Sequence, residues 1–188
     1  MALPHIQNSE AGRNYYEPYF TSLFEVYFTI PAALQASFGK DVNLLSEHVT
    51  KVGGLELDKT PEVKQQNYHG TVRSYLAPHI GDTSFTITVD LTLNLRNETD
   101  NYIYKLFKAW NNLNYNIETG ESEVKANYIA EFLRVAVSNR KGDILRDVTF
   151  KDVILTKVTS PTDFDYTSDE PGTLSLEFKS DWKTEENA

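Results

Sequence analysis

The sequence predicts a mainly β domain, an antiparallel β-barrel or sandwich with one amphipathic α-helix packed on it. The first observation is an alternation of apolar and polar residues over residues 84–95, which is typical of a strand with one dry face. The second is a set of apolar residues spaced three and four apart after residue 100, which indicates a helix. A length of 188 residues fits one domain with short extensions.

The chain divides into three parts. Residues 1–20 mix polar and aromatic residues without periodicity, so we expect an N-terminal arm. Residues 21–183 carry the β domain, and residues 184–188 form an acidic tail that we expect to be loose. Neither a signal peptide nor an apolar run approaching the ~20 residues of a membrane helix is visible. We therefore expect the chain to fold in a cytoplasm.

The first part of the domain is expected to hold two strands and a hairpin. The first strand, over residues 23–30, is expected to end before Pro31, because proline lacks a backbone N–H donor. Residues 44–57 are expected to form a second strand, which Gly53 and Gly54 interrupt at a bend, a bulge or a close backbone approach. A polar hairpin over about residues 44–76 is expected to protrude from the domain.

The strand over residues 84–95 is the clearest one, and a helix follows it. The strand has an apolar face and a polar, threonine-rich face. Asp100 or Thr99 is the expected N-cap of the helix. Four apolar residues on one face of the helix are expected in the core: Ile103, Leu106, Phe107 and Trp110.

The last part of the chain is expected to continue the sheet. Asn139 and Gly142 lie in a short polar gap between two strand-like runs, which predicts a β-hairpin. A further strand is expected over residues 153–158. In the last strand, Trp182 continues the alternation of three apolar residues and is expected on the same face as Leu174, Leu176 and Phe178.

Composition and motifs exclude several classes of function. Lys+Arg is 18 and Asp+Glu is 27, a net charge of −9, which argues against a dedicated nucleic-acid binder because such proteins carry basic surfaces. The absence of cysteine removes disulfides, thiolate zinc sites and cysteine nucleophiles. The four histidines lack metal-ligand spacing, and no phosphate-binding loop or G-x-S-x-G motif occurs. Residues 37–40 fit S-x-x-K, but the partner motifs of that enzyme class are missing. We expect no enzyme activity, no metal and no cofactor.

Several short segments occur in a characteristic order along nearly the whole chain: residues 23–28, 52–55, 68–70, 84–89, 104–110, 148–153, 161–166, 174–178 and 181–182. In this order and spacing the chain resembles the tail tube proteins of tailed bacteriophages, especially those with contractile tails. The tube subunits of phage-like injection systems and of type VI secretion share that architecture.

The resemblance implies a structural role in an assembly. Six copies would form a ring whose inner strands join into one β-barrel, and rings would stack into a hollow tube. The tube would conduct double-stranded DNA, with sheath, baseplate and tail terminator proteins as partners, in a virion tail assembled in the host cytoplasm. The arm and the hairpin would bridge subunits and rings, with candidate contact residues Tyr15, Tyr16, Tyr19, Lys51, Glu62, Lys64, Tyr68 and Tyr75.

The polar face of the strand over residues 84–95 is the candidate lining of the tube. A lining of hydroxyls, amides and carboxylates would let DNA pass, because lysine or arginine would hold phosphates through counterion release. The candidate residues facing the lumen are Ser84, Thr86, Thr88, Asp90, Thr92 and Asn94. The alternative is that this face meets solvent or a neighbouring element, since one-sided alternation is common in antiparallel sheets.

Three other functions stay open. The chain could be the tube protein of a contractile injection or secretion system, or another ring component of a tail. It could also be a carbohydrate-binding β-sandwich that uses the tyrosines near Tyr15, Tyr16 and Tyr19 as sugar platforms. The lack of a secretion signal argues against the carbohydrate-binding module.

Overall fold

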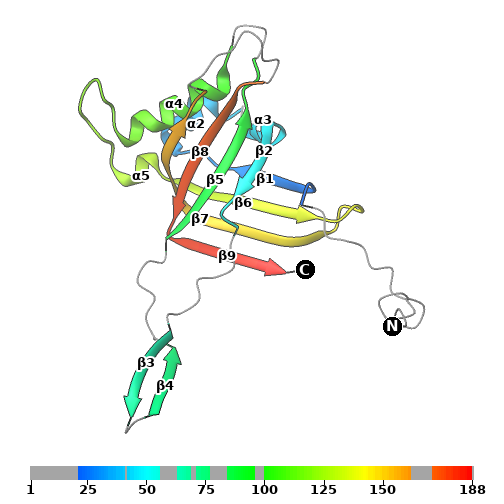
Figure 1. Ribbon diagram of the computed structural model, residues 1–188. Coiled ribbons are helices and arrows are strands. Elements are labelled where there is room, and N and C mark those ends of the chain that lie inside the picture. Colours follow the sequence, from blue (N-terminus) through cyan, green and yellow to red (C-terminus); the bar gives the residue numbers. More distant parts are fainter. Residues whose placement is uncertain are drawn as a thin grey trace.

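The described part of the chain forms two antiparallel sheets that share one long strand, with helices on one side, and a separate two-stranded hairpin (Figure 1). The computed structural model describes residues 21–40, 42–55, 63–68, 71–76, 84–95, 100–161 and 171–187. The strands are β1 (Phe24–Phe28), β2 (Val49–Gly53), β3 (Val63–Tyr68), β4 (Thr71–Leu76), β5 (Phe85–Thr92), β6 (Ala130–Ser138), β7 (Ile144–Thr159), β8 (Thr173–Ser180) and β9 (Trp182–Asn187). The helices are α2 (Ala32–Phe38), α3 (Val42–Leu45), α4 (Tyr102–Asn114) and α5 (Lys125–Tyr128). The prediction of a mainly antiparallel β fold with a packed helix is confirmed.

Strand β7 links the two sheets. The strand order is β1-β6-β7-β8-β5-β2, and β9 also pairs with β7. Residues 144–153 of β7 pair with β6, and residues 154–159 pair with β8. Next to this change of partner, Asp152 has a φ of 54°, a left-handed conformation that aspartate tolerates better than most residues. One strand therefore turns from the first sheet into the second.

Ser180 lies at the corner where the chain passes from one sheet to the other, between β8 and β9. It ends β8, and after a bend at Asp181 the chain continues as β9 in the other sheet. Ser180 is 1% exposed, and its Oγ lies within hydrogen-bonding distance of Lys151 O and Trp182 O. Trp182 N donates to Ser180 Oγ at 3.3 Å. The buried hydroxyl is thus satisfied where the two strands change sheets.

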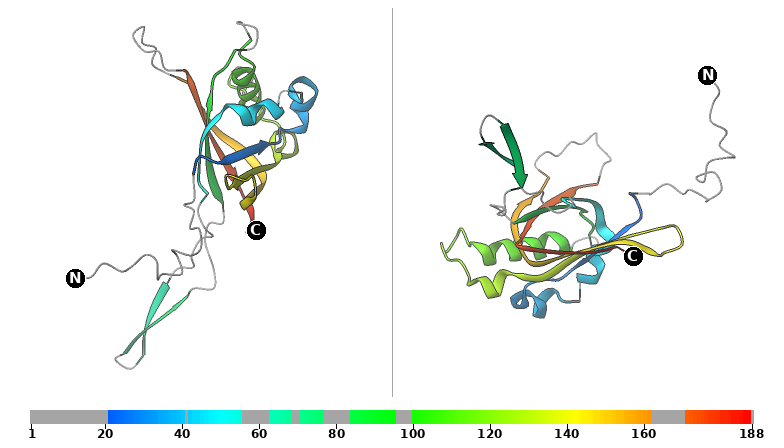
Figure 2. Two further views of the ribbon diagram at one scale, coloured as in Figure 1. Left: turned by 90° about the vertical axis from the view of Figure 1, so that its right-hand side faces the viewer. Right: turned by 90° about the horizontal axis from the view of Figure 1, so that it is seen from below.

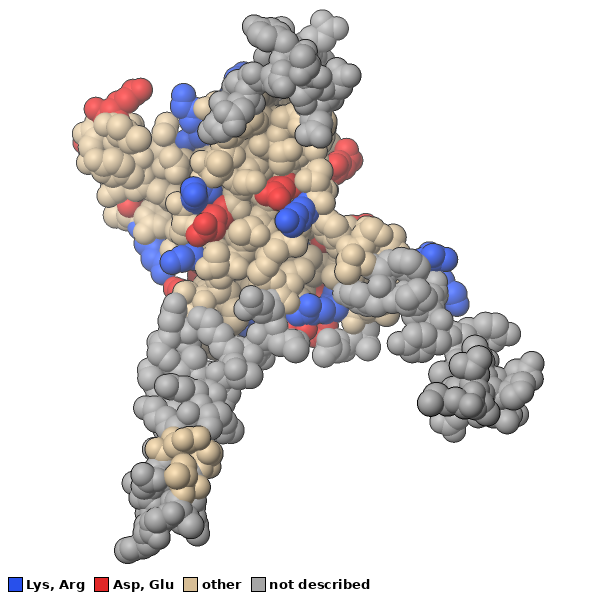
Figure 3. Space-filling view, viewed as in Figure 1, with Lys and Arg blue, Asp and Glu red and all other residues tan. Residues whose placement is uncertain are grey.

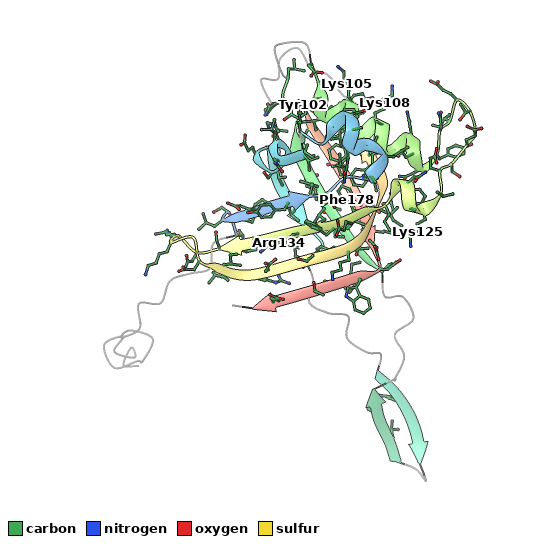
Figure 4. The ribbon with its side chains drawn as sticks, turned by 180° about the vertical axis from the view of Figure 1, so that it is seen from behind. Tyr102, Lys105, Lys108, Lys125, Arg134 and Phe178 are labelled. Carbon is green, nitrogen blue, oxygen red and sulfur yellow. The ribbon has the colours of Figure 1, made fainter. Side chains whose placement is uncertain are left out.

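The core lies between the two sheets and helix α4. Trp110 of α4 stacks on Phe107 with 6.0 Å between ring centroids, and it lies 5.6 Å from Phe178 of β8. The indole Nε1 of Trp110 donates to Tyr128 O at 2.9 Å, which ties α4 to α5. Figure 4 shows Phe178 in the middle of the molecule, beneath the helices. Aromatic rings from α4 and β8 therefore join the helix to the sheet.

Helix α4 has the two faces that its sequence predicts. Lys105 and Lys108 are exposed on its outer side (Figure 4), and its predicted core residues are 0–1% exposed: Ile103, Leu106, Phe107 and Trp110. The predicted N-cap is wrong, because Asn101 Oδ1 accepts from Tyr104 N at 3.2 Å. Asp100 instead pairs with Lys105 at 2.7 Å. Asparagine and aspartate both cap well, so residue type does not distinguish Asp100 from Asn101. The cap is Asn101 because the helix begins at Tyr102.

The glycine pair marks a close approach of β2 to β5. A Cβ atom on Gly53 would lie 2.5 Å from Thr88 Oγ1. Gly54 has a φ of 83°, and a Cβ atom there would lie 2.1 Å from Thr86 O. The strand register also shifts between Val49 and Lys51, which is a β-bulge. At the glycine pair the predicted disruption is therefore confirmed as a close backbone approach, whereas the bulge lies earlier in the strand.

Two predictions about the chain before the hairpin are wrong. Residues 44–48 form the end of α3 and a 3₁₀ turn rather than a strand, because the end of α3 buries Leu45 fully and leaves Leu44 38% exposed. The protruding hairpin is shorter than residues 44–76, because β2 belongs to the main sheet. It consists of β3 and β4, paired from Val63↔Leu76 to Tyr68↔Thr71. Figures 1 and 2 show it apart from the two sheets.

The predictions about the C-terminus also need correction. Residues 182–187 are not loose but form β9, which pairs with β7 from Lys151↔Trp182 to Arg146↔Asn187. Trp182 is 62% exposed and leaves the face of the apolar residues in β8. The reason is the bend at Asp181, which interrupts the strand and resets the alternation.

Replacing Ser180 by alanine tests the corner. We expect the free energy of unfolding to fall by about 1–3 kcal/mol, because the buried backbone groups of the corner lose a hydrogen-bonding partner. Urea unfolding of the purified variant measures this loss. The exposed Ser122→Ala variant is the control and should stay within about 0.5 kcal/mol of the unmodified protein. Equal stability of both variants would show that Ser180 does not hold the corner.

Candidate assembly surface

The side of the sheet β7-β8-β5-β2 that faces away from the helices is open and polar (Figure 3). Ser175 of β8 donates from Oγ to Asp90 of β5, and Thr156 of β7 donates from Oγ1 to Glu177 O at 3.0 Å. Alternate residues of β5 lie on this side, directly opposite alternate residues of β8. We call this side the hydroxyl face and define it by Lys51, Thr86, Thr88, Asp90, Thr92, Thr156, Lys157, Thr159, Thr173, Ser175, Glu177 and Lys179.

The hydroxyl face carries charges of both signs. Lys51 of β2 is directly opposite Asp90, and Lys157 of β7 is directly opposite Glu177. Lys179 adds a further positive charge on β8. The predicted polar face of β5 has no lysine, but the neighbouring strands add three lysines to the same side of the sheet. The lysines come from β2, β7 and β8, which the alternation of one strand could not reveal.

The ends of the predicted polar strand lie at the rim of the hydroxyl face. Ser84 is half-buried and lies just before β5. Asn94 lies beyond the end of β5, where its Nδ2 is 2.7 Å from His48 Nδ1. His48 Nε2 is in turn 2.5 Å from Tyr102 OH. These contacts join the end of β5 to the start of α4, so Asn94 has a structural partner within the same chain.

Two edge strands border this sheet. Among the described residues, β2 pairs with β5 alone, and residues 154–159 of β7 pair with β8 alone. All these pairs are antiparallel, so the two edge strands run in opposite directions. Asn114 Nδ2 donates to Leu155 O at 2.5 Å and covers part of the β7 edge. Edge strands of this kind are templates for pairing with another chain.

An ion cluster joins β7, β9 and the segment before the hairpin. Arg146 Nε donates to Glu185 Oε1 at 2.6 Å, and its Nη2 donates to Leu55 O at 3.0 Å. Lys183 Nζ lies 3.0 Å from Glu185 Oε2 and 5.7 Å from the ring centroid of Phe85. The hydrogen bonds from Arg146 and, less strongly, from Lys183 lower the pKa of Glu185 from 4.5 to about 2. The cluster therefore holds β9 against β7.

Sequence reasoning missed this cluster. Arg146 and Glu185 are far apart in the sequence, and the acidic composition of the last residues indicated a loose tail. No local pattern marks the partners, because only the β7–β9 pairing brings them together.

A groove opens beside the β2 edge, next to the ion cluster. Its volume is about 380 Å³, and its lining combines apolar and polar side chains: Thr21, Phe24, Thr50, Lys51, Val52, Leu55, Val137 and Arg146. Among the described residues, no group of three or more His, Asp or Glu is placed to hold a metal ion. Within the same residues, no helix is both long and apolar enough to cross a membrane.

Comparison with solved structures identifies the fold. A chain in the sheath-tube complex of an extracellular contractile injection system (PVC) in the extended state has a TM-score of 0.60 and 15% identity, over 96% of this chain and 99% of that one. A chain in the tube-terminating cap of the anti-feeding prophage has a TM-score of 0.59 and 18% identity, over 92% of this chain and 93% of that one. A chain in the sixfold-symmetrised baseplate of that prophage has a TM-score of 0.54 and 14% identity, over 92% and 97%. The chain has a tail-tube fold. No protein-family model and no curated protein matches its sequence.

The predicted contact residues lie on several segments of the chain. Lys51 lies on the β2 edge, and Lys64, Tyr68 and Tyr75 lie on the β3–β4 hairpin. Four others lie outside the described residues: Tyr15, Tyr16, Tyr19 and Glu62.

The pKa of Glu185 predicts an acid-sensitive docking of β9. Because the folded-state pKa of about 2 lies below the ordinary 4.5, the ionised carboxylate stabilises the fold above pH 4.5, and this stabilisation is lost as pH falls toward 2. The expected loss is about 2–3 kcal/mol in the free energy of unfolding. Urea unfolding between pH 7 and pH 3 should show a steeper decline for the unmodified protein than for Glu185→Gln. The exposed Glu47→Gln variant is the control. Parallel pH profiles for the unmodified protein and Glu185→Gln would contradict this role of the cluster.

Proposed function

We propose that this chain is the structural subunit of the tube of a contractile tail-like particle, and not an enzyme. The observation that carries the proposal is the sheet with an open hydroxyl face and two edge strands that run in opposite directions. If β2 of one copy pairs with β7 of the next, the junction is antiparallel like the rest of the sheet. Repeated head to tail, this contact closes into a ring and leaves no edge of the β7-β8-β5-β2 sheet unpaired.

A sixfold ring with a central bore fits this geometry. A chain of the same fold occurs in a baseplate described as sixfold symmetrised. Four strands from each of six copies exceed the roughly 16–18 strands of porins, whose barrels already enclose a water-filled channel. The hydroxyl face would line the bore, because it is the side of the sheet opposite to the helices. Stacked rings would then form the tube.

The helices would lie on the outside of the tube. Lys105 and Lys108 of α4 are exposed on that side (Figure 4). Chains of this fold occur in a sheath-tube complex, a tube-terminating cap and a baseplate. We therefore propose a sheath as the outer partner, with terminator and baseplate proteins at the two ends. The particle would be a virion tail or an injection or secretion device, assembled in the host cytoplasm.

Two of the three lysines of the hydroxyl face lie opposite carboxylates, which fits the passage of a polyanion. In a virion tail the cargo would be double-stranded DNA. Lys51 and Lys157 are each directly opposite a carboxylate, so the protein itself provides their counter-charge. A lysine with a carboxylate opposite it neutralises a DNA phosphate less completely, so fewer counterions leave the DNA and we expect its adhesion to the wall to be weak.

A tube terminator is the second candidate function. The likeness to the tube-terminating cap has almost the same TM-score as the likeness to the sheath-tube complex, 0.59 against 0.60. A terminator would use the same edge-to-edge ring but would not stack on itself.

Electron microscopy of the purified chain distinguishes these functions. We expect negative-stain images to show hollow sixfold rings that stack into rods as the protein concentration is raised. Rings that never stack, alone or with added salt, would favour the terminator. Monomers throughout the concentration range, measured by analytical ultracentrifugation, would contradict both functions.

Neutralising the carboxylates of the hydroxyl face tests its role as the wall of a DNA conduit. In the double variant Asp90→Asn and Glu177→Gln, the lysines of the face lose their counter-charges. We expect assembled rods of this variant to retain short double-stranded DNA in co-sedimentation, with a retention that falls between about 50 and 200 mM salt. The unmodified rods and the control Glu47→Gln, Glu131→Gln should retain little DNA. Equal retention by all three proteins would show that the hydroxyl face does not meet the cargo.

A further inference from the structure

The two lateral ends of the subunit carry complementary surfaces. At one end is the connection between α4 and α5, residues 115–124, which we call the acidic loop. At the opposite end is the connection between β6 and β7 with the first residues of β7, residues 139–145, which we call the basic turn. Figure 1 and the view from below in Figure 2 both place these two segments at opposite sides of the molecule.

The acidic loop combines negative charge with exposed apolar side chains. Its acidic residues are all exposed: Glu118, Glu121 and Glu123. Ile117 is 83% exposed, Val124 66% and Tyr115 54%. Asn116 holds the loop in shape, because its backbone N donates to Glu121 O at 2.8 Å and its O accepts from Gly120 N at 2.8 Å. Large apolar groups on an ordered, charged projection are typical of a surface that another molecule covers.

The basic turn presents the opposite charge beside apolar groups. Arg140 and Lys141 are exposed at its tip, and Ile144 and Leu145 are each 40% exposed. Asn139 shapes the turn, since its Oδ1 accepts from Lys141 N at 2.8 Å and from Asp143 N at 2.9 Å. The carboxylate of Asp143 accepts from Asn139 Nδ2 at 2.9 Å. The tip therefore presents two cations and one carboxylate.

These two surfaces lie on the same sides as the two sheet edges. In Figure 1 the acidic loop lies on the side of residues 154–159 of β7, and the basic turn lies on the side of the β2 edge. In Figure 3, drawn in the same view, acidic side chains gather at the loop end and basic side chains at the turn end. A ring formed edge to edge would bring the acidic loop of one copy to the side where the next copy carries its basic turn.

From this juxtaposition we propose that neighbouring subunits of a ring bind each other through the acidic loop of one copy and the basic turn of the next. The partner is thus a second copy of this chain, and the proposal rests on the proposed ring. The contact is heterologous, with two different surfaces on each copy, which is the arrangement that closes into a ring. The opposite charges set the direction of assembly and disfavour contacts of like surfaces, while the apolar side chains supply buried area.

Charge reversal with exchange of partners tests the contact. One variant carries Arg140→Glu and Lys141→Glu, so that both of its lateral surfaces are negative. The other carries Glu118→Lys and Glu121→Lys, so that its basic turn faces a loop made positive. At about 150 mM salt we expect the ring fraction of each variant alone to fall at least about tenfold, because like charges meet at every junction. An equal mixture of the two should form rings again, since each negative surface then meets a positive one.

Circular dichroism and analytical ultracentrifugation provide the controls. Both variants should have the secondary structure of the unmodified protein, because the changed side chains are exposed. The matched variant Lys105→Glu, Lys108→Glu reverses two charges on the outer side of α4 and should form rings normally. Rings from either lateral variant alone, or no rings from the mixture of two folded variants, would overturn this contact and leave the proposed function intact. Failure of the unmodified chain to form rings would overturn the proposed function and the contact together.

Discussion

The backbone of the two edge strands is the constraint on which the rest of the structure depends. Apart from Leu155 O, which accepts from Asn114, the N–H and C=O groups that point outward from β2 and from residues 154–159 of β7 can be paired by water or by another chain. The sheet holds four alternating strands, so its two edges run in opposite directions and fit each other across copies. A protein with one such edge could form only a pair, whereas one with two complementary edges can form a closed ring.

The corner between the sheets determines which side of the β7-β8-β5-β2 sheet stays open and which segments lie beside its edges. The turn at Asp152 and the buried hydroxyl of Ser180 send β7 and β9 into the other sheet, so only the last part of β7 stays beside β8. As a result, one side of the β7-β8-β5-β2 sheet packs on α4 and the other stays open. The same corner makes β7 long enough to carry the basic turn at one end and an edge at the other.

The charge of each surface differs from the net charge of the chain. The chain has a net charge of −9, yet the hydroxyl face combines lysines with carboxylates. Part of the negative charge lies in the acidic loop, and part is neutralised within the ion cluster around Glu185. An acidic protein can therefore present a nearly neutral sheet face and strongly charged loops, because each surface depends on its own few residues.

The sequence by itself determined the strand over residues 85–92, the buried face of α4 and the β-hairpin at Asn139, because each of these follows from a local pattern of burial or turn chemistry. The tertiary structure alone decided the rest. Residues 182–187 became a strand only because β7 offered a partner and Arg146 and Lys183 neutralise Glu185. The lysines joined the hydroxyl face only through pairing with distant strands, and the acidic loop and the basic turn reached opposite ends only through the path of the chain. Such features depend on residues that are close in space but far apart in sequence, and no local period records them.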